Sequence, residues 1–120
     1  MDAYGHVNNA RFLTLFEEAR IDLMFIAQKK EMTANDGAIV VARHEVDYLR
    51  PVDFGDDVRI EMWMDDIRRS RFSVLYELFA GDVLASRGRT VCVPFDLSRG
   101  RPRRLTSPEL EFLGQWVEHA

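Results

Sequence analysis

The sequence predicts an α+β domain built from one long helix, an antiparallel sheet and a short C-terminal helix. Apolar residues recur every three or four positions near the N-terminus, as in an amphipathic helix, and then every second position from about residue 38, as in strands. Strand-like runs that follow one another without intervening helices favour an antiparallel sheet. The 120 residues are enough for one domain, 1–120, and too few for two ordinary cores.

The long helix is predicted from Ala10 to Lys29. Asn8 and Asn9 precede it as good N-cap residues, and Lys30 follows where a cation favours a helix C-terminus. Its apolar positions cover a wide side, so we expect the sheet to wrap around the helix. Those positions are Phe12, Leu13, Leu15, Phe16, Ala19, Leu23, Met24, Phe25 and Ile26.

Four strands follow, predicted at residues 38–50, 58–65, 72–79 and 83–95. The first opens with an apolar, β-branched run, which predicts burial on both faces. The second alternates apolar and polar residues, which is typical of a half-buried strand. Gly81-Asp82 predicts a tight hairpin turn between the third and fourth strands. We therefore expect the strands to pair in hairpin-like succession.

The C-terminal part is predicted to be a loop followed by a short helix. Asp96 to Arg104 contains Pro, Gly, Ser and four arginines, which favours a loop. Thr106-Ser107-Pro108-Glu109 combines hydroxyl caps, an early Pro and an early acid, which predicts a helix start. The helix should run to about Glu118. Its predicted apolar face consists of Leu110, Leu113, Trp116 and Val117.

Composition narrows the function classes. The 20 acidic and 16 basic side chains give a net charge of −4, which is unlike a nucleic-acid-binding domain. The single cysteine, Cys92, excludes an intramolecular disulfide framework and a multi-cysteine zinc site, and we expect it to be a small buried apolar residue. No apolar run approaches the ~20 residues of a membrane helix, and the first residues lack the pattern of a signal peptide. These features predict a cytoplasmic protein without a metal, nucleic-acid or membrane partner.

The N-terminal segment carries the strongest chemical signal. Asp2 lies just ahead of Gly5 and of the predicted helix start at Asn9. Unsatisfied N–H groups at a helix start could hold a carbonyl oxygen as it becomes an oxyanion, and the carboxylate could act as a nucleophile or as a general base for water. Gly5 would let the backbone approach a ligand closely. His6 follows Gly5, either as a second acid–base group or, as we favour, in a structural role at the helix entry.

This segment resembles the signature of hotdog-fold acyl-CoA thioesterases of the 4-hydroxybenzoyl-CoA thioesterase type. The matching residues are Asp2 to Phe12, with Gly5-His6-Val7-Asn8-Asn9, and Glu17-Glu18-Ala19-Arg20 downstream. Val46 to Val52, with Phe54-Gly55-Asp56, is similar to the family's second strand and its turn. Arg68 to Phe72 resembles the strand that meets the coenzyme A side. The similarity extends to about Phe95.

The resemblance implies a hotdog fold, in which a curved antiparallel sheet wraps a long central helix, and hydrolysis of an acyl-CoA thioester. The catalytic carboxylate falls on Asp2, as nucleophile or general base, and the N–H that polarises the carbonyl falls on Asn9. The proposed substrate-binding residues are Gly5, His6, Tyr48, Arg69, Ser70 and Arg71. Coenzyme A is part of the substrate and no other cofactor is implied. The site of this fold lies between subunits, so the resemblance implies a homodimer, commonly doubled to a tetramer.

Three alternatives stay open at this stage. Tyr48 could line the acyl pocket, cross the dimer seam or only pack in its strand. A non-catalytic acyl-CoA-binding module would bind without turnover, and an enoyl-CoA hydratase would need a motif that the sequence lacks.

Family members also carry a strand before the catalytic Asp. That first strand is missing from this sequence, so we expect Asp2 to be poorly ordered unless upstream residues exist.

Overall fold

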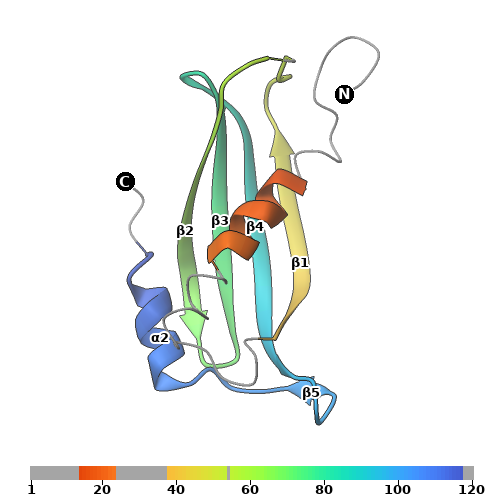
Figure 1. Cartoon of the computed structure of the whole chain (residues 1–120), viewed down its shortest axis with the longest axis vertical. Coiled ribbons are helices and arrows are strands. Elements are labelled where there is room, and N and C mark those ends of the chain that lie inside the picture. The colour runs from red at the N-terminus through yellow and green to blue at the C-terminus, as the bar shows by residue number, and fades with distance from the viewer. Residues whose placement is uncertain (1–13, 24–37, 54, 118–120) are drawn as a thin grey trace.

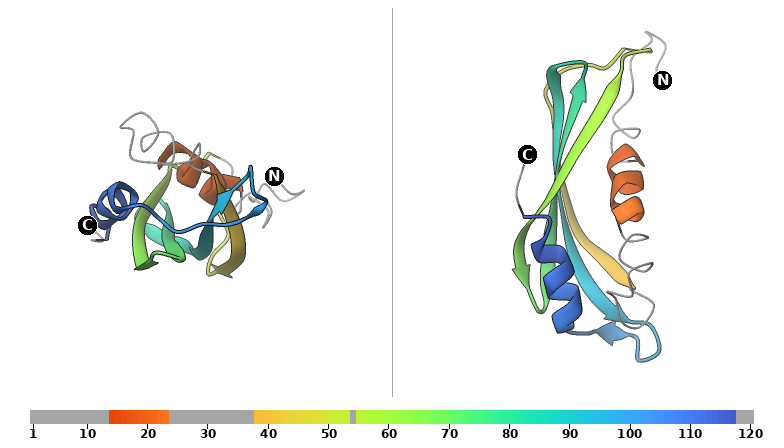
Figure 2. Two further views of the ribbon diagram at one scale, coloured as in Figure 1. Left: turned by 90° about the horizontal axis from the view of Figure 1, so that it is seen from below. Right: turned by 60° about the vertical axis from the view of Figure 1, so that its left-hand side comes forward.

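The fold is a long, curved antiparallel sheet with a helix lying across one of its faces (Figure 1). The structure is a computed structural model and describes residues 14–23, 38–53 and 55–117. The first described helix, here called the N-terminal helix, is seen over residues 14–23. The predicted bounds of this helix, Ala10 and Lys29, lie outside the described residues. Figure 2 shows this helix on one side of the sheet and α2 beside an edge.

The sheet has the strand order β1-β4-β3-β2. Its strands are β1 (Ile39–Tyr48), β2 (Val58–Arg68), β3 (Arg71–Ala80) and β4 (Val83–Asp96). The predicted hairpin pairing holds for β2–β3 and β3–β4, and Gly81 lies in the predicted turn with φ 61°. It is wrong for β1, which pairs with β4 and lies at the opposite edge from β2. The alternation of residues predicts strands but carries no information on this long-range order.

The predicted burial of the first strand on both faces is also wrong. Val40 and Val41 in β1 are 44% and 36% exposed. The reason is position: β1 is an edge strand and is paired on one side, by β4, in the described part of the chain. A break in register between Val41 and Arg43 marks a β-bulge, which turns the later residues of β1 to new faces.

The core lies between the N-terminal helix and the inner face of the sheet. Phe16 and Leu23 from the helix are 2% and 1% exposed, and their seven-residue spacing puts them on one helix face. They meet strand residues that alternate inward, as the period-2 pattern predicts. The buried strand residues are Met64, Phe72, Val74, Tyr76, Leu78, Ala85 and Cys92. Cys92 is therefore a buried apolar residue, as predicted.

The C-terminal segment folds along the β2 edge. The helix α2 (Ser107–Gly114) begins at the predicted cap, where the Thr106 hydroxyl accepts from the Glu109 N–H and the Glu109 carboxylate accepts from the Thr106 N–H. It ends at Gly114, before the predicted Glu118, and Phe112 is buried on it while Val117 is 47% exposed. The predicted loop from Asp96 contains a two-residue strand, β5 (Arg101–Pro102), paired with β4.

Candidate functional site

The residues with the strongest sequence signal lie outside the described part of the structure. Asp2, Gly5, His6 and Asn9 precede residue 14, so their assigned roles stay predictions. The described structure instead shows how the helix that follows them is seated, which residues surround it, and where Tyr48 and the predicted arginine group lie.

An aromatic stack seats the N-terminal helix on the sheet. The rings of Phe16 and Tyr76 are 4.7 Å apart between centroids and inclined by 25°. Phe16 can approach this closely because β4 carries Gly88 beneath it. A Cβ at Gly88 would lie 3.0 Å from the Phe16 ring and 3.2 Å from the Tyr76 ring. The glycine thus makes room for both rings and fixes the height of the helix above the sheet.

A chain of polar side chains runs from the helix to the edge of the sheet. The Arg20 guanidinium donates to the Tyr76 hydroxyl at 3.1 Å, and Tyr76 is hydrogen-bonded to Thr90. The Thr90 hydroxyl lies 2.9 Å from Nδ1 of His44 on β1. Burial raises the pKa of Tyr76, with Thr90 and Arg20 opposing the shift, so the phenol is protonated at neutral pH. The N-terminal helix, β3, β4 and β1 are therefore connected by side-chain hydrogen bonds. None of these side chains has a role in the mechanism inferred from the sequence.

The first hydrogen bond of this chain has a fixed direction. Arginine is a donor only, so the Tyr76 oxygen accepts from Arg20. At the other end, the direction of the hydrogen bond between the Thr90 hydroxyl and Nδ1 of His44 depends on the imidazole tautomer. Burial and then the charge of Arg20 lower the pKa of His44, while Glu17 opposes them. Burial and Arg20 thus favour the neutral form of His44.

Tyr48 is at the end of β1, opposite Ser86, and is 41% exposed. It lies on the edge strand and not in the described core, so of the three interpretations the structure disfavours only strand packing in the interior. Its position is compatible with a pocket or an interface at the β1 edge.

The β2–β3 turn holds the predicted group Arg69, Ser70 and Arg71. Arg69 donates to the Leu105 carbonyl at 2.9 Å, and the Leu105 N–H donates to the Arg69 carbonyl at 2.7 Å. Arg69 therefore ties the turn to the C-terminal segment. Ser70 is exposed. The Arg71 guanidinium lies 3.2 Å from Asp66, which also pairs with Arg68 at 2.9 Å.

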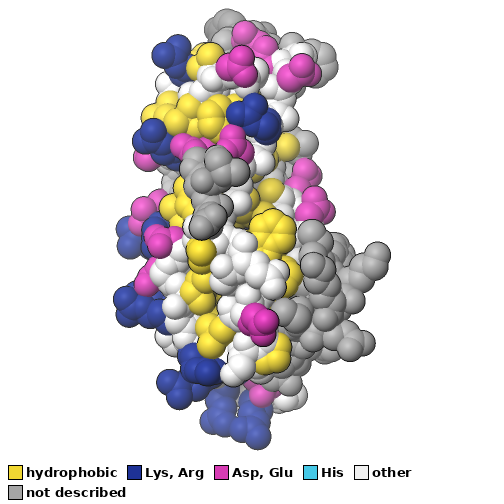
Figure 3. Space-filling view, turned by 90° about the vertical axis from the view of Figure 1, so that its left-hand side faces the viewer, with side chains coloured by type: hydrophobic (Ala, Val, Ile, Leu, Met, Phe, Trp, Pro, Cys, Tyr) yellow, Lys and Arg dark blue, Asp and Glu magenta, His cyan; other side chains and the backbone are white. Residues whose placement is uncertain are grey.

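The arginines at this end of the molecule point outward while their carboxylate partners are recessed. The side chains of Arg68 and Arg71 are 62% and 44% exposed, whereas that of Asp66 is 27% exposed. In the β4–β5 turn, Arg99 is 66% exposed and its partner Asp96 is 17% exposed. Figure 3 shows the basic side chains gathered at the lower end. An acidic protein thus presents a positive surface at one end, which favours a polyanionic ligand there.

One further arginine at this end has a structural partner. Arg103 forms a two-pronged pair with Glu109 at 2.7 and 2.8 Å, and the side chains are only 9% and 6% exposed. The hydrogen bonds that Arg103 donates to Glu109 raise the pKa of Arg103, and burial opposes them. The pair fixes the start of α2 next to β4, so it is not available to a ligand. Of the four arginines in the segment predicted as a loop, Arg99 is therefore exposed and Arg103 is buried.

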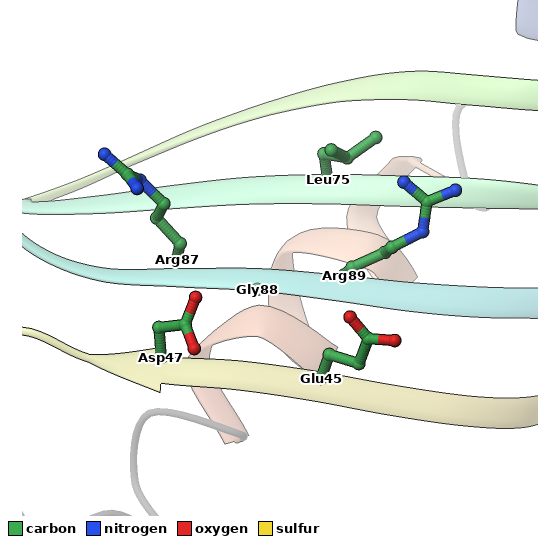
Figure 4. Close-up of a pocket in the computed structure, with 6 residues that line it drawn as sticks. All are labelled: Glu45, Asp47, Leu75, Arg87, Gly88 and Arg89. Carbon is green, nitrogen blue, oxygen red and sulfur yellow. The ribbon is translucent and has the colours of Figure 1, made fainter.

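The outer face of the sheet, away from the helix, carries a shallow charged hollow. It is lined by Glu45 and Asp47 of β1, Arg87 and Arg89 of β4, and Leu75 of β3 (Figure 4). Arg89 pairs with Asp65 at 3.2 Å and Arg87 with Glu77 at 3.7 Å, so both arginines have partners. In residues 14–23, 38–53 and 55–117, no three His, Cys, Asp or Glu side chains converge as a metal site requires. Neither described helix could span a bilayer.

All but the last three residues of the chain match a known family. The model of the thioesterase-like superfamily matches residues 1–117. The chain belongs to this superfamily. The matched range includes both the Asp2 segment and the sheet, so the two parts of the resemblance fall within one family match.

Solved structures agree with the fold. A thioesterase from Thermus thermophilus, crystallised with coenzyme A and zinc, is 33% identical, with 97% of this chain and 84% of that chain covered and a TM-score of 0.81. The probable thioesterase YbaW from Escherichia coli is 27% identical, with 98% and 91% covered and a TM-score of 0.83. The arrangement of helix and curved sheet is therefore the hotdog thioesterase fold.

Shorter matches exist to characterised enzymes. The long-chain acyl-CoA thioesterase FadM of Escherichia coli is 42% identical over 57 residues, which is 47% of this chain and 43% of FadM. The 1,4-dihydroxy-2-naphthoyl-CoA hydrolase of Crocosphaera subtropica is 28% identical over 81 residues, 65% of this chain and 59% of that enzyme. Both matched regions span less than two thirds of the relative.

Sequence reasoning did not single out His44, which the structure places beside Thr90. Directly bonded residues of the polar chain are 46 and 56 positions apart, so local patterns do not bring them together. One signal was available. Tyr76 and Thr90 are polar, but the residues two positions away on the same face of their strands are not charged or polar. Arg20 likewise lies close to the wide apolar side of the predicted helix. Buried polar groups need hydrogen-bond partners, so a polar residue at an inward position predicts a second polar residue close to it in the fold.

Proposed function

We propose that the protein is a thioesterase that hydrolyses acyl-CoA to a free acid and coenzyme A. The observation that carries this is the family match over residues 1–117, which includes the carboxylate segment as well as the sheet. A thioesterase that is 33% identical was crystallised with coenzyme A, and two shorter matches are named for acyl-CoA hydrolysis. The 4-hydroxybenzoyl-CoA subtype and the acyl group stay predictions.

Asp2 is the proposed catalytic carboxylate. It either attacks the thioester carbonyl, forming a mixed anhydride that water then hydrolyses, or removes a proton from water that attacks directly. On both routes the backbone N–H of Asn9 stabilises the oxyanion, and the carbon–sulfur bond breaks to release the thiolate, which takes up a proton. The products are a carboxylic acid and free coenzyme A. No cofactor other than the coenzyme A of the substrate is needed.

The seat of the N-terminal helix supports this mechanism. Oxyanion stabilisation depends on N–H groups held in place before the reaction. The stack of Phe16 on Tyr76 above Gly88 and the hydrogen bond from Arg20 fix the helix on the sheet. Asn9 precedes the described helix by five residues, so we expect the position of its N–H to depend on how this helix is seated.

The exposed arginines at the β2–β3 turn are the proposed contacts for the phosphates of coenzyme A. Arg71 and Arg68 present their guanidinium groups outward from a recessed Asp66, and guanidinium groups suit phosphate oxygens. Ser70 lies between Arg69 and Arg71 in the same turn. Arg69 holds the turn against Leu105, so its proposed role in binding is to position its neighbours. Gly5, His6 and Tyr48 are the proposed contacts nearer the thioester.

The proposal is tested by thiol release from a panel of acyl-CoA esters. Asp2→Asn should lower kcat at least about 100-fold with the fold intact, since it removes the nucleophile or base. Asp22→Asn, an exposed change of the same kind on the N-terminal helix, should have no effect. Full activity of Asp2→Asn would refute the mechanism. Binding without released thiol would identify a non-catalytic module, and addition of water to an enoyl-CoA would identify a hydratase.

A second experiment tests the phosphate contacts. Arg71→Ala should raise KM for an acyl-CoA about tenfold but leave KM for the matching acyl-pantetheine unchanged, because the latter lacks the nucleotide phosphates. Arg87→Ala, which removes an arginine from the outer sheet face, serves as the control. An equal rise of KM for both substrates would contradict the assignment of Arg71 to the phosphate end.

We also propose that the working form is a homodimer, doubled to a tetramer, in the cytoplasm. A dimer follows from the resemblance, in which the site lies between subunits. The exposed residues of β1 support it, because an edge strand with exposed Val40, Val41 and Tyr48 is a surface that a second copy can cover.

A further inference from the structure

We propose that the β4–β5 turn docks the protein on an anionic lipid surface. Leu97 in this turn enters the headgroup region, and the arginines around it bind lipid phosphates. The inference goes beyond the proposed function and does not depend on it. A contact of this kind needs no membrane-spanning run of apolar residues, and the lack of such a run was the ground for expecting no membrane partner.

The β4–β5 turn, residues 97–100, forms the tip of the molecule at one end of its longest dimension (Figure 1, Figure 2). Leu97 is 69% exposed, which is the highest value among the exposed large apolar side chains of the described residues. A single exposed leucine is ordinary on a protein surface. Its basic surroundings and the rigid backbone beneath it are what indicate a partner.

The side chains around the tip leucine are basic. Residues 96–104 contain four arginines and one aspartate, in a chain whose net charge is −4. The side chain of Arg99 is 66% exposed, whereas that of Asp96 is recessed at 17%. Arg101 and Arg104 are exposed, and neither pairs with a carboxylate in the part of the chain that the structure describes. The tip therefore carries a positive potential that attracts an anionic surface.

Hydrogen bonds hold the turn in one shape. The Asp96 carboxylate accepts from the N–H groups of Ser98 and Arg99 at 3.0 and 3.2 Å, and from the Ser98 hydroxyl at 2.7 Å. The Gly100 N–H donates to the Asp96 carbonyl at 2.8 Å, and Gly100 has the positive φ, 64°, that closes the turn. Leu97 is thus presented to solvent by a backbone that is already ordered, so docking costs little further ordering.

A narrow convex tip fits a lipid surface better than a protein surface. A stable protein interface buries about 800 Å² on each partner, which a turn of four residues does not supply. A bilayer accepts a convex tip because its headgroups move aside, and its contacts add up one side chain at a time. Each arginine near an anionic surface strengthens binding about fivefold. A water-soluble polyanion would contact the arginines but leave Leu97 in water.

The first test measures binding of the full chain to lipid vesicles by co-sedimentation. The dissociation constant for phosphatidylcholine vesicles with about 30% phosphatidylglycerol should be at least about tenfold lower than for phosphatidylcholine alone, and it should rise with added salt. Leu97→Ser should raise it about tenfold, because the apolar contact is lost. Val83→Ser, which changes an exposed apolar residue at the far end of β4, should have no effect.

The charge requirement is tested with the same vesicles. Arg101→Glu should raise the dissociation constant at least about tenfold, because it replaces an attraction with a repulsion. Arg50→Glu makes the same change in net charge at an exposed position just beyond the other end of the sheet, after β1, and should leave the constant nearly unchanged. An equal loss from both variants would show attraction by net charge alone and overturn the inference.

The second test measures whether residue 97 enters the lipid. Leu97→Cys is labelled with a fluorophore sensitive to polarity, and Cys92 is buried and does not compete for the label. Its emission should shift to the blue on anionic vesicles, and that of labelled Val83→Cys should not. Equal binding to neutral vesicles, or unchanged binding of Leu97→Ser, overturns the inference. Binding without a blue shift at residue 97 also overturns it and indicates a water-soluble acidic partner.

Thiol release separates this inference from the proposed function. Without vesicles, Leu97→Ser should release thiol from a short-chain acyl-CoA at the rate of the unchanged protein, since the proposed mechanism assigns no role to Leu97. This result also shows that the variant is folded. An unchanged protein that binds vesicles but releases no thiol would refute the proposed function alone, and one that releases thiol but binds no vesicles would refute the docking alone.

Discussion

Replacing Gly88 with alanine tests whether the height of the N-terminal helix is fixed by the space above β4. The added Cβ would lie 3.0 and 3.1 Å from two Phe16 ring carbons and 3.2 Å from Tyr76. Carbon atoms in contact prefer about 3.5–4.0 Å, so the ring must retreat by roughly 0.5–1 Å. Both neighbours are buried, and the ring cannot retreat without moving the helix.

The expected loss of stability follows from two opposing effects. Overpacking a dense core costs about 1–3 kcal/mol. Gly88 does not have a positive φ, so alanine is free of backbone strain there and gains about 0.5–1 kcal/mol by restricting the unfolded chain. The net free energy of unfolding should fall by about 1–2 kcal/mol. Since the shift reaches the helix that leads to Asn9, we expect kcat for thiol release to fall as well.

The assay is urea denaturation at fixed protein concentration, in a double-mutant cycle with Phe16→Leu. The smaller side chain vacates the space, so Gly88→Ala should cost little in that background, and the coupling should be about 1–2 kcal/mol. Gly114→Ala is the matched control, because a Cβ at Gly114 meets nothing within 4 Å. An equal loss from Gly88→Ala in both backgrounds would refute the steric argument.

Other expected outcomes concern the C-terminal clamp, the buried thiol and the polar chain. Glu109→Gln should lower the free energy of unfolding by about 3–5 kcal/mol in urea titrations, because it leaves the charge of Arg103 buried without its counterion, whereas the exposed change Glu111→Gln should be neutral. Burial raises the pKa of Cys92 from 9.0 to about 11, so the buried neutral thiol stabilises the fold fully below pH 9. The free energy of unfolding should then fall by about 2–3 kcal/mol as the pH rises towards 11, and Cys92→Ala should remove this pH dependence. Tyr76→Phe keeps the ring stack but breaks the link between Arg20 and Thr90, so the free energy of unfolding, measured in urea titrations, should fall by about 1–3 kcal/mol.

Local patterns predicted the strands well and their order poorly. Val58 to Asp65 and Phe72 to Phe79 lie within the observed β2 and β3, because side-chain alternation is a local property. The place of β1 beside β4 depends on contacts more than 40 residues apart in the chain, such as that of His44 with Thr90. No local period encodes such a contact. The exposure of Val40 and Val41 follows from that place and was mispredicted with it.

The candidate site shows the same division. Arg69, Ser70 and Arg71 were predicted together as substrate-binding residues, which stays a prediction, and the structure shows the side chain of Arg71 44% exposed. Charge counting could not distinguish Arg71 from Arg69, whose side chain is bound to a carbonyl of the C-terminal segment. The same applies to Arg103, buried against Glu109. The sequence shows which residues are charged, but only the three-dimensional fold shows which charges already have a partner.

Tyr76 connects the two features on which the proposed function depends. One face of its ring supports Phe16 and so seats the helix that leads to the proposed oxyanion site. Its hydroxyl accepts from Arg20 and is hydrogen-bonded to Thr90, whose hydroxyl lies 2.9 Å from Nδ1 of His44 on β1. A change in the protonation of His44 must alter the hydrogen bond that Thr90 makes, and hence the one that reaches Arg20 on the helix. The β1 edge and the N-terminal helix are therefore connected through the buried side chains of Tyr76 and Thr90.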